Sequence, residues 1–236
     1  MTDGLLNKCR AALLDLLFPP KCAFCGRLME EPGDVCPACE KALLWREEEK
    51  VLSYIGEKRY PCAVTFYYGG PAEQGVKALK FGRKSWRAKV FARYIAGTAA
   101  ERFPGGFDAV TFVPVSLRRN FERGFDQARL LADAAAGIWG IKAEPLLRKI
   151  RHTKAQSSLT DPSQREKNVK DAYRVPHPER VRGRRFLLID DVCTTGSTMA
   201  SAADALMEAG AAGVVCAALA GGRREKKRTA EDFGKN

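Results

Sequence analysis

The chain has 236 residues, 45% of them hydrophobic, which is enough for one α/β domain and a small additional module. No run of eighteen apolar residues occurs, and this argues against a membrane-spanning helix. The net charge of +12 attracts polyanions, although solvated lysines and arginines are also common on proteins without such a partner.

The first predicted element is a short amphipathic helix over residues 5–17, which ends before Pro19 and Pro20. Its apolar residues are interrupted by polar ones, and the segment lacks both the apolar core and the cleavage site of a secretory signal. We therefore expect a cytoplasmic protein that keeps its thiols reduced.

Two C-x-x-C pairs follow, Cys22–Cys25 and Cys36–Cys39, with ten residues between them. Each pair can place two thiolates on one metal ion, so the four sulfurs predict a tetrahedral, structural zinc site. Disulfides are the alternative, but a reducing compartment favours zinc.

The other cysteines show no such spacing, and they are Cys9, Cys62, Cys193 and Cys216. We interpret them as small buried hydrophobic residues. Cys193 lies beside the turn Thr194–Thr198, which we interpret as a phosphate-binding loop, so a reactive thiol is the alternative interpretation for this residue.

The rest of the chain alternates predicted strands and helices. Strands are expected at 63–68, 109–115, 144–149, 185–190 and 213–219. A short polar helix is expected after the cysteine pairs, from about residue 40 to about residue 50. Further helices are expected at 72–81, 86–102, 124–138 and 197–209. This alternation predicts a mostly parallel sheet with flanking helices over 56–236, preceded by the cysteine module in 1–55. A polar loop at about 151–170 and a basic tail over 221–236 complete the chain.

Cations gather in four groups along the sequence. The first comprises Lys77, Lys80, Arg83, Lys84, Arg87, Lys89 and Arg93. The others comprise Arg118, Arg119 and Arg123; Arg148, Lys149, Arg151 and Lys154; and Arg223, Arg224, Lys226, Lys227 and Arg228. Aromatic residues interrupt the first group, which permits base stacking, but we favour helices that pack their aromatics into a core.

The most informative segment begins with the apolar strand Phe186–Ile189, which two acids, Asp190 and Asp191, follow directly. A turn of hydroxyl-bearing and small residues comes next, formed by Thr194, Thr195, Gly196, Ser197 and Thr198. Backbone amides, hydroxyls and a helix N-terminus converge there, and together they predict a phosphate-binding loop. The acids can bind sugar hydroxyls or a metal that accompanies phosphate, although acids that merely cap the next helix are the simpler alternative.

A second candidate ligand loop follows the strand predicted at 109–115. It carries Arg118, Arg119 and Arg123, whose forked donors can grip a diphosphate, unless they form a solvated face. Ligands of open α/β sheets bind at the carboxyl ends of the strands, so both loops are expected at one edge of the sheet.

The segment Phe186–Thr198 resembles the phosphoribosyl pyrophosphate (PRPP) signature of the type I phosphoribosyltransferases. Nearly the whole chain resembles, more narrowly, the competence protein F family (ComF, with GntX-like relatives). Further matching segments are Leu-Phe-Pro-Pro-Lys-Cys ahead of the cysteines, Val76–Phe81, Val113–Val115, Arg123–Gln127 and Thr153–Leu159. The chain departs from the family at Ser116, at Asp126, where asparagine is usual, and at 171–173. Asp126 adds negative charge near the proposed diphosphate site.

This resemblance implies a type I phosphoribosyltransferase-like fold behind a zinc module. It implies that Thr194–Thr198 holds the 5′-phosphate of PRPP and that Asp190 and Asp191 hold the ribose hydroxyls, with Mg²⁺ nearby. It also implies that Arg118, Arg119 and Arg123 bind the pyrophosphate, with help from Lys77 and Lys80. The loop at about 151–170 would close over the ligand.

Three functions remain open from the sequence. One is a phosphoribosyltransferase that acts on an unidentified acceptor. The second is a protein that handles single-stranded DNA during natural transformation and uses PRPP as a regulatory ligand, as the family's link to DNA uptake suggests. The third is an adaptor whose zinc module docks on a partner such as a helicase.

Overall fold

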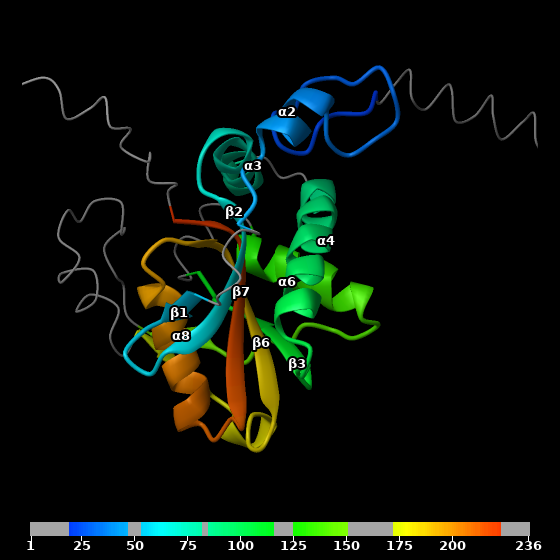
Figure 1. Ribbon diagram of the computed structural model, residues 1–236. Coiled ribbons are helices and arrows are strands. Elements are labelled where there is room, and N and C mark those ends of the chain that lie inside the picture. Colours follow the sequence, from blue (N-terminus) through cyan, green and yellow to red (C-terminus); the bar gives the residue numbers. More distant parts are fainter. Residues whose placement is uncertain (1–18, 47–52, 82–84, 116–124, 151–171, 223–236) are drawn as a thin grey trace, which may run out of the picture.

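Figure 1 shows the computed structural model of the chain, which describes residues 19–46, 53–81, 85–115, 125–150 and 172–222. The predicted helix at 5–17, the arginines Arg118, Arg119 and Arg123, and the polar loop at about 151–170 lie outside these residues.

A five-stranded sheet forms the centre of the fold, in the order β1-β2-β7-β6-β3 (Figure 1). Its strands are β1 (Ser53–Ile55), β2 (Tyr60–Tyr67), β3 (Ala109–Phe112), β6 (Arg185–Cys193) and β7 (Gly213–Gly221). Only β1 pairs antiparallel, and the other four strands run parallel. The sheet is therefore mostly parallel, as predicted.

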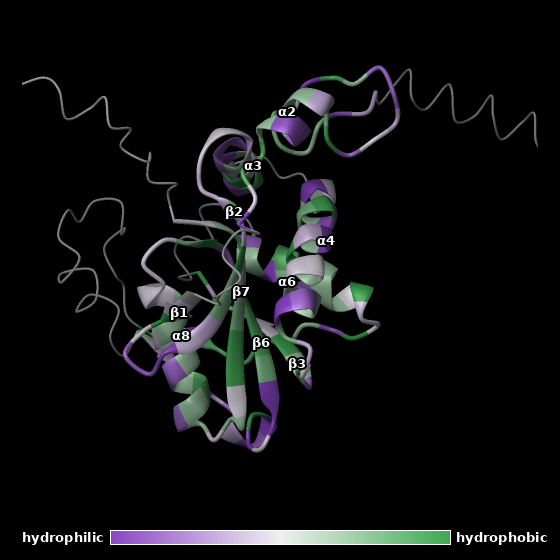
Figure 2. Cartoon of the chain, in the orientation of Figure 1, coloured by the Kyte–Doolittle hydropathy of each residue, from purple (hydrophilic) through white to green (hydrophobic). Residues whose placement is uncertain are grey.

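Helices cover both faces of this sheet. Figure 1 shows α4 (Ser85–Arg102) and α6 (Gln127–Ile138) on one side and α8 (Ser197–Glu208) on the other. α3 (Gly70–Phe81) contributes Val76 and Leu79 to the first side. Because both faces are buried, the central strands carry runs of consecutive apolar residues rather than alternating ones, and Figure 2 shows these runs in green on β6 and β7, with a hydrophilic end on β6.

The remaining elements are short. They are α2 (Pro37–Ala42) in the cysteine module, the antiparallel pair β4 (Arg148–Lys149) and β5 (Tyr173–Arg174), and a 3₁₀ turn at Pro178–Arg180. β1 and β5 were not predicted, because two or three residues carry too little periodicity to reveal a strand.

Several boundaries differ from the sequence-based ones. β6 continues through both acids to Cys193, and β7 reaches Gly221, where the basic tail was expected to begin. β3 ends at Phe112, and α6 begins only at Gln127 because Asp126 caps it. Of the strand expected at 144–149, only Arg148–Lys149 forms.

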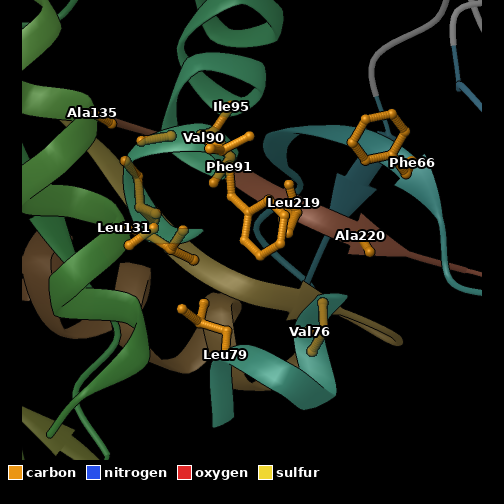
Figure 3. Packing of buried hydrophobic residues seen from close by; sticks show 14 of the residues in the cluster. Phe66, Val76, Leu79, Val90, Phe91, Ile95, Leu131, Ala135, Leu219 and Ala220 are labelled. Carbon is orange, nitrogen blue, oxygen red and sulfur yellow. The ribbon is translucent and has the colours of Figure 1, made fainter. Parts of the chain in front are cut away.

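The cysteine module inserts the aromatic side chain of Phe24 into the core of the main domain. Its ring centre lies 5.0 Å from that of Phe91 and 5.8 Å from that of Phe66. Phe66 and Phe91 belong to the core shown in Figure 3. Helix α3 approaches closely at Gly75, where a Cβ would stand 2.9 Å from the Phe24 and Phe91 rings. The module therefore shares the core of the main domain instead of forming a separate body joined only by the chain.

No helix within the described ranges combines the length and apolarity needed to cross a bilayer.

Substituting Phe24→Ala should lower the free energy of unfolding by about 3–5 kcal/mol, because it opens a cavity between the module and α4. Urea unfolding followed by circular dichroism measures the change. The matched control is Leu28→Ala in the same module, since Leu28 is 58% exposed and its loss should change stability by under about 0.5 kcal/mol. Equal effects of the two substitutions would contradict the shared core.

Candidate functional site

The four predicted zinc ligands come together in the structure. The sulfurs of Cys22, Cys25, Cys36 and Cys39 all lie within 4.8 Å of one another, and those of Cys25 and Cys36 are 3.9 Å apart. Tetrahedral Zn–S bonds of about 2.3 Å require sulfurs about 3.8 Å apart, so the cluster fits zinc. Gly26 makes the knuckle turn with a φ of 77° and donates to the Cys22 carbonyl.

The electrostatic environment differs between the thiols of the cluster. Burial opposes ionisation of Cys22, but hydrogen bonds from the backbone amides of Cys36, Cys25 and Phe24 outweigh it and lower the Cys22 pKa to about 7. Burial and the hydrogen bonds with the neighbouring cysteines raise the pKa of Cys39 instead. Zinc-bound cysteines must be deprotonated, so a bound metal would stabilise the thiolate form of all four.

A buried arginine fastens the cysteine module to α4. The Arg87 guanidinium donates to the carbonyl oxygens of Ala23 at 2.6 Å and Phe24 at 3.3 Å, and only 5% of Arg87 is exposed. Burial lowers the pKa of Arg87, whereas the nearby Cys22 and Cys25 act in the opposite direction. Arg87 thus places a positive charge beside the sulfur cluster, a role that the sequence did not reveal.

The first group of cations, from Lys77 to Arg93, is largely engaged within the protein. Lys77 pairs with Glu73 at 2.8 Å, Lys80 pairs with Asp191, and Arg93 pairs with Asp34. Arg87 is buried as described. Phe91 is fully buried, which supports the core interpretation of the aromatic residues in this group. Within the described part of the group, Lys80 and Arg87 are thus taken up by internal contacts, whereas Lys77, Lys89 and Arg93 stay exposed.

The predicted phosphate loop lies between β6 and α8 at the carboxyl end of β6. Thr194 and Thr195 are exposed, and the Thr195 hydroxyl lies 3.0 Å from that of Ser197. Ser197 begins α8, so its backbone amide belongs to the helix N-terminus, where anions bind favourably. Two hydroxyls of the segment thus lie together at the start of α8, and phosphate binding there stays a prediction.

Only glycine fits at position 196 of this loop. Gly196 has a φ of 77°, in the left-handed region, and a Cβ there would collide with the side chain of Ile55 in β1. The hairpin of β1 and β2 therefore presses against the loop from one side. This support was missed in the sequence because β1 is so short.

The two acids form a pair with one lysine. The Lys80 Nζ lies 2.9 Å from Asp191 Oδ2, and the backbone amide of Asp191 donates to Asp190 Oδ1 at 2.8 Å. Asp191 is 8% exposed. Lys80, on α3, was predicted to help bind pyrophosphate, and its observed contact is with the acid pair.

Electrostatics differ between the members of this group. Burial, together with the charge of Asp191, raises the pKa of Asp190 well above its usual range. Burial opposes the charge on Lys80, but Asp191 and Asp190 outweigh it and raise the Lys80 pKa. Burial thus favours the protonated form of Asp190, and Lys80 balances the charge on Asp191.

Asp126 holds the flanks of the arginine-bearing segment together. Its Oδ2 accepts from the Val115 amide at 2.9 Å, and its Oδ1 accepts from the Arg129 amide at 3.1 Å as the N-cap of α6. Burial raises the pKa of Asp126. The sequence assigned Asp126 to the surroundings of the diphosphate, whereas both of its oxygens make structural hydrogen bonds.

The flanks of the predicted closing loop also meet. β4 pairs antiparallel with β5, and the Ile150 amide donates to the Ala172 carbonyl at 2.8 Å. The intervening residues 151–171 lie outside the described part of the chain.

Two cysteines with no sequence spacing prove to be neighbours below the phosphate loop. The Cys62 thiol donates to the Cys193 sulfur at 3.8 Å. This contact and burial raise the Cys62 pKa, whereas the same hydrogen bond lowers that of Cys193. Both are buried, in agreement with the sequence-based interpretation, but their contact was not predicted.

Comparisons with known proteins agree with both parts of this architecture. Residues 13–51 match the double zinc ribbon domain, and residues 128–234 match the phosphoribosyl transferase domain. Within the described residues there is one four-cysteine group, so a single zinc ribbon site is present there. The fold is accordingly type I phosphoribosyltransferase-like, with a four-cysteine zinc ribbon module ahead of it.

Relatives extend the similarity along the chain. DNA utilization protein YhgH of Escherichia coli K12 is 30% identical over 207 residues, covering 82% of this chain and 86% of that protein. Competence protein ComFC of Bacillus subtilis is 25% identical over 194 residues, covering 82% and 74%. The glutamine PRPP amidotransferase structure from B. subtilis is 23% identical with a TM-score of 0.39, covering 61% of this chain and 27% of that one. The chain belongs to the ComF-like family of type I phosphoribosyltransferase proteins.

Metal analysis of the purified protein should find about one zinc ion per four-cysteine group, because four thiolates close a tetrahedral site. Cys39→Ser should lose zinc and melt at a lower temperature, since zinc binding contributes to folding. Cys216→Ala is the matched control, because this buried cysteine lies outside the cluster and should retain zinc. Purified protein without zinc would contradict the assignment.

Proposed function

We propose that the chain binds PRPP between the acid pair and the phosphate loop. The observation that carries this proposal is the convergence of Asp190, Asp191 and the loop 194–198 at one end of β6, beside the N-terminus of α8. In the proposed complex, the loop hydroxyls and amides hold the 5′-phosphate, and the two carboxylates accept hydrogen bonds from the ribose hydroxyls.

Lys80 has a defined part in this proposal. It neutralises Asp191 before the ligand arrives, and this limits the repulsion between two adjacent carboxylates. Mg²⁺ prefers oxygen ligands and usually binds through one or two carboxylates together with substrate phosphates, so Asp190 and Asp191 fit the ion that accompanies PRPP. When bound, the ion would neutralise charge on the pyrophosphate.

The pyrophosphate site remains a prediction from the resemblance. Arg118, Arg119 and Arg123 belong to the segment whose two flanks Asp126 holds together beside β6. Lys80 could exchange Asp191 for pyrophosphate, whereas Lys77 pairs with Glu73 on the exposed side of α3. Such donors would stabilise the negative charge that develops on pyrophosphate as it leaves the ribose. A well-placed donor lowers the free energy of this transition state by about 3–4 kcal/mol. We rank PRPP binding ahead of turnover, and the acceptor stays open.

A second function concerns DNA. The relatives are named for DNA utilization and for competence, and the chain carries a net charge of +12. We propose a cytoplasmic role in DNA uptake, in which PRPP serves as a substrate or as a regulatory ligand for a protein that handles single-stranded DNA or docks on a helicase. Because Lys80 and Arg87 are engaged inside the protein and Lys77 and Arg93 make surface ion pairs, the other basic groups would supply most of the DNA contacts.

PRPP with Mg²⁺ should raise the melting temperature, because a ligand at one hundred times its Kd stabilises the fold by about 2.7 kcal/mol. Asp190→Asn should abolish this rise. The control Asp133→Asn, on the exposed part of α6, should leave it unchanged. A rise that persists in Asp190→Asn would show that the site lies elsewhere.

The same substitution should stabilise the ligand-free protein at neutral pH. The folded-state pKa of Asp190 is raised, so the folded state prefers the protonated acid and stability increases as the pH falls through that pKa. Asn is neutral and keeps the Oδ1 that accepts from the Asp191 amide. Melting curves recorded across pH should give Asp190→Asn a higher melting temperature than the wild type at neutral pH. The two melting temperatures should converge under acidic conditions.

Single-stranded DNA should bind with a steep dependence on salt. With six phosphate contacts on a single strand, the affinity should fall by about 300-fold between about 50 and 200 mM salt, and more contacts should make the fall steeper. Fluorescence anisotropy of a labelled oligothymidine, with and without PRPP, measures this. Absence of binding at about 50 mM salt would remove the DNA proposal, and equal affinities in the two arms would remove PRPP as its regulator.

A further inference from the structure

The contact between Cys62 and Cys193 joins two strands that are not neighbours in the sheet. Cys62 lies in β2 and Cys193 ends β6, with β7 between the two strands. Their sulfurs are nevertheless 3.8 Å apart, and the residues are 2% and 6% exposed. A disulfide bond of about 2.05 Å requires the sulfurs to approach by about 1.8 Å in total. Because β7 separates the two strands, each about 4.8 Å from it, the bond also requires the backbone at the end of β6 to move toward β2.

The position of Cys193 connects this pair to the phosphate loop. Its sulfur lies 3.6 Å from the point where a Cβ of Gly196 would stand, so it supports the inner side of the turn. Its carbonyl oxygen accepts from the Gly222 amide at 3.2 Å. Since Ile55 confines Gly196 from another side, a displacement of Cys193 toward β2 cannot leave the turn unchanged.

We propose that Cys62 and Cys193 form an oxidisable thiol pair whose cross-link weakens binding of the phosphorylated ligand at the adjacent loop. The second half of this proposal rests on the proposed function, whereas the first half does not. The oxidant class is a peroxide. The sulfur of one thiolate attacks the O–O bond and becomes a sulfenic acid, and the second thiol then displaces water to form the disulfide. Two thiols lose two protons and two electrons, and one hydrogen peroxide becomes two waters.

Burial determines the rate of this reaction. Peroxide reaches the pair only when the loop and the β1–β2 hairpin separate transiently, because both sulfurs are covered in the closed state. A ligand that binds only the closed loop reduces the open population. PRPP with Mg²⁺ at one hundred times its Kd should therefore slow cross-linking about a hundredfold.

The experiment treats the reduced, zinc-loaded full chain with hydrogen peroxide and maps the peptides without reduction. Trypsin alone leaves Cys193 and Cys216 in one peptide, since no lysine or arginine lies between them. A second protease that cleaves after glutamate separates them at Glu208. We expect a linked pair containing Cys62 and Cys193, two hydrogens lighter than its parts, while zinc remains bound.

Variants make the assignment specific. Cys62→Ala and Cys193→Ala should each lose the linked pair, and Cys216→Ala should keep it. The thiol pair is overturned if no linked peptide forms before zinc is released, or if Cys216 replaces either partner. Release of zinc is followed with a chromogenic chelator, because the zinc thiolates are themselves oxidisable.

The regulatory half has its own measurement. The affinity for PRPP with Mg²⁺ is taken from melting curves of the reduced and the cross-linked protein, and we expect at least a tenfold loss that dithiothreitol reverses. Equal affinities would overturn regulation and leave the thiol pair standing. If the reduced protein shows no PRPP effect, both the regulatory half and the proposed function fail, and the peptide map still decides the thiol pair.

Discussion

The parallel pairing of β6 with β3 and β7 is the constraint on which the site depends. Ile189 lies opposite Phe112 on one side and Ala217 on the other, so the register brings the ends of three strands to one edge. β6 then runs beyond β3, and its acids stand at the edge of the sheet beside the start of α8. Lys80 reaches the same edge from α3, and Asp126 closes the flanks of the arginine-bearing segment there. A shift of β6 by one residue would turn Asp191 to the opposite face and remove its contact with Lys80.

The sequence predicted those parts of the molecule whose residues are contiguous or regularly spaced. The acids, the hydroxyl-rich turn and α8 follow one another directly, and the four cysteines carry their own spacing. The alternation of apolar segments also sufficed for a mostly parallel sheet. Groups that meet only in the folded chain could not be found this way. The Lys80–Asp191 ion pair, the contact of Ile55 with Gly196 and the Cys62–Cys193 contact each join residues that lie far apart in the sequence.

Charge was the property that the sequence described least well. A count of lysines and arginines suggests a uniform basic surface between Lys77 and Arg93, whereas the structure uses these cations individually. One balances an acid pair, two make surface ion pairs, and one is buried against the cysteine module. The net charge thus predicts long-range attraction of polyanions, whereas the local role of each cation depends on which neighbours the fold provides.

The burial of Arg87 beside the sulfur cluster has a consequence for the metal. Four thiolates around a divalent ion carry an overall double negative charge, and the guanidinium lies where it offsets part of it. Without the ion most of the negative charge of the cluster is lost, because sulfurs released from the metal take up protons. The buried cation would then keep only the partial counter-charge of Cys22, whose pKa is about 7, and a buried charge with an incomplete partner is unfavourable. Loss of the metal would therefore destabilise α4 as well as the zinc ribbon. The stability of this long helix, which packs against the sheet, would depend on whether a metal site outside its own domain is occupied.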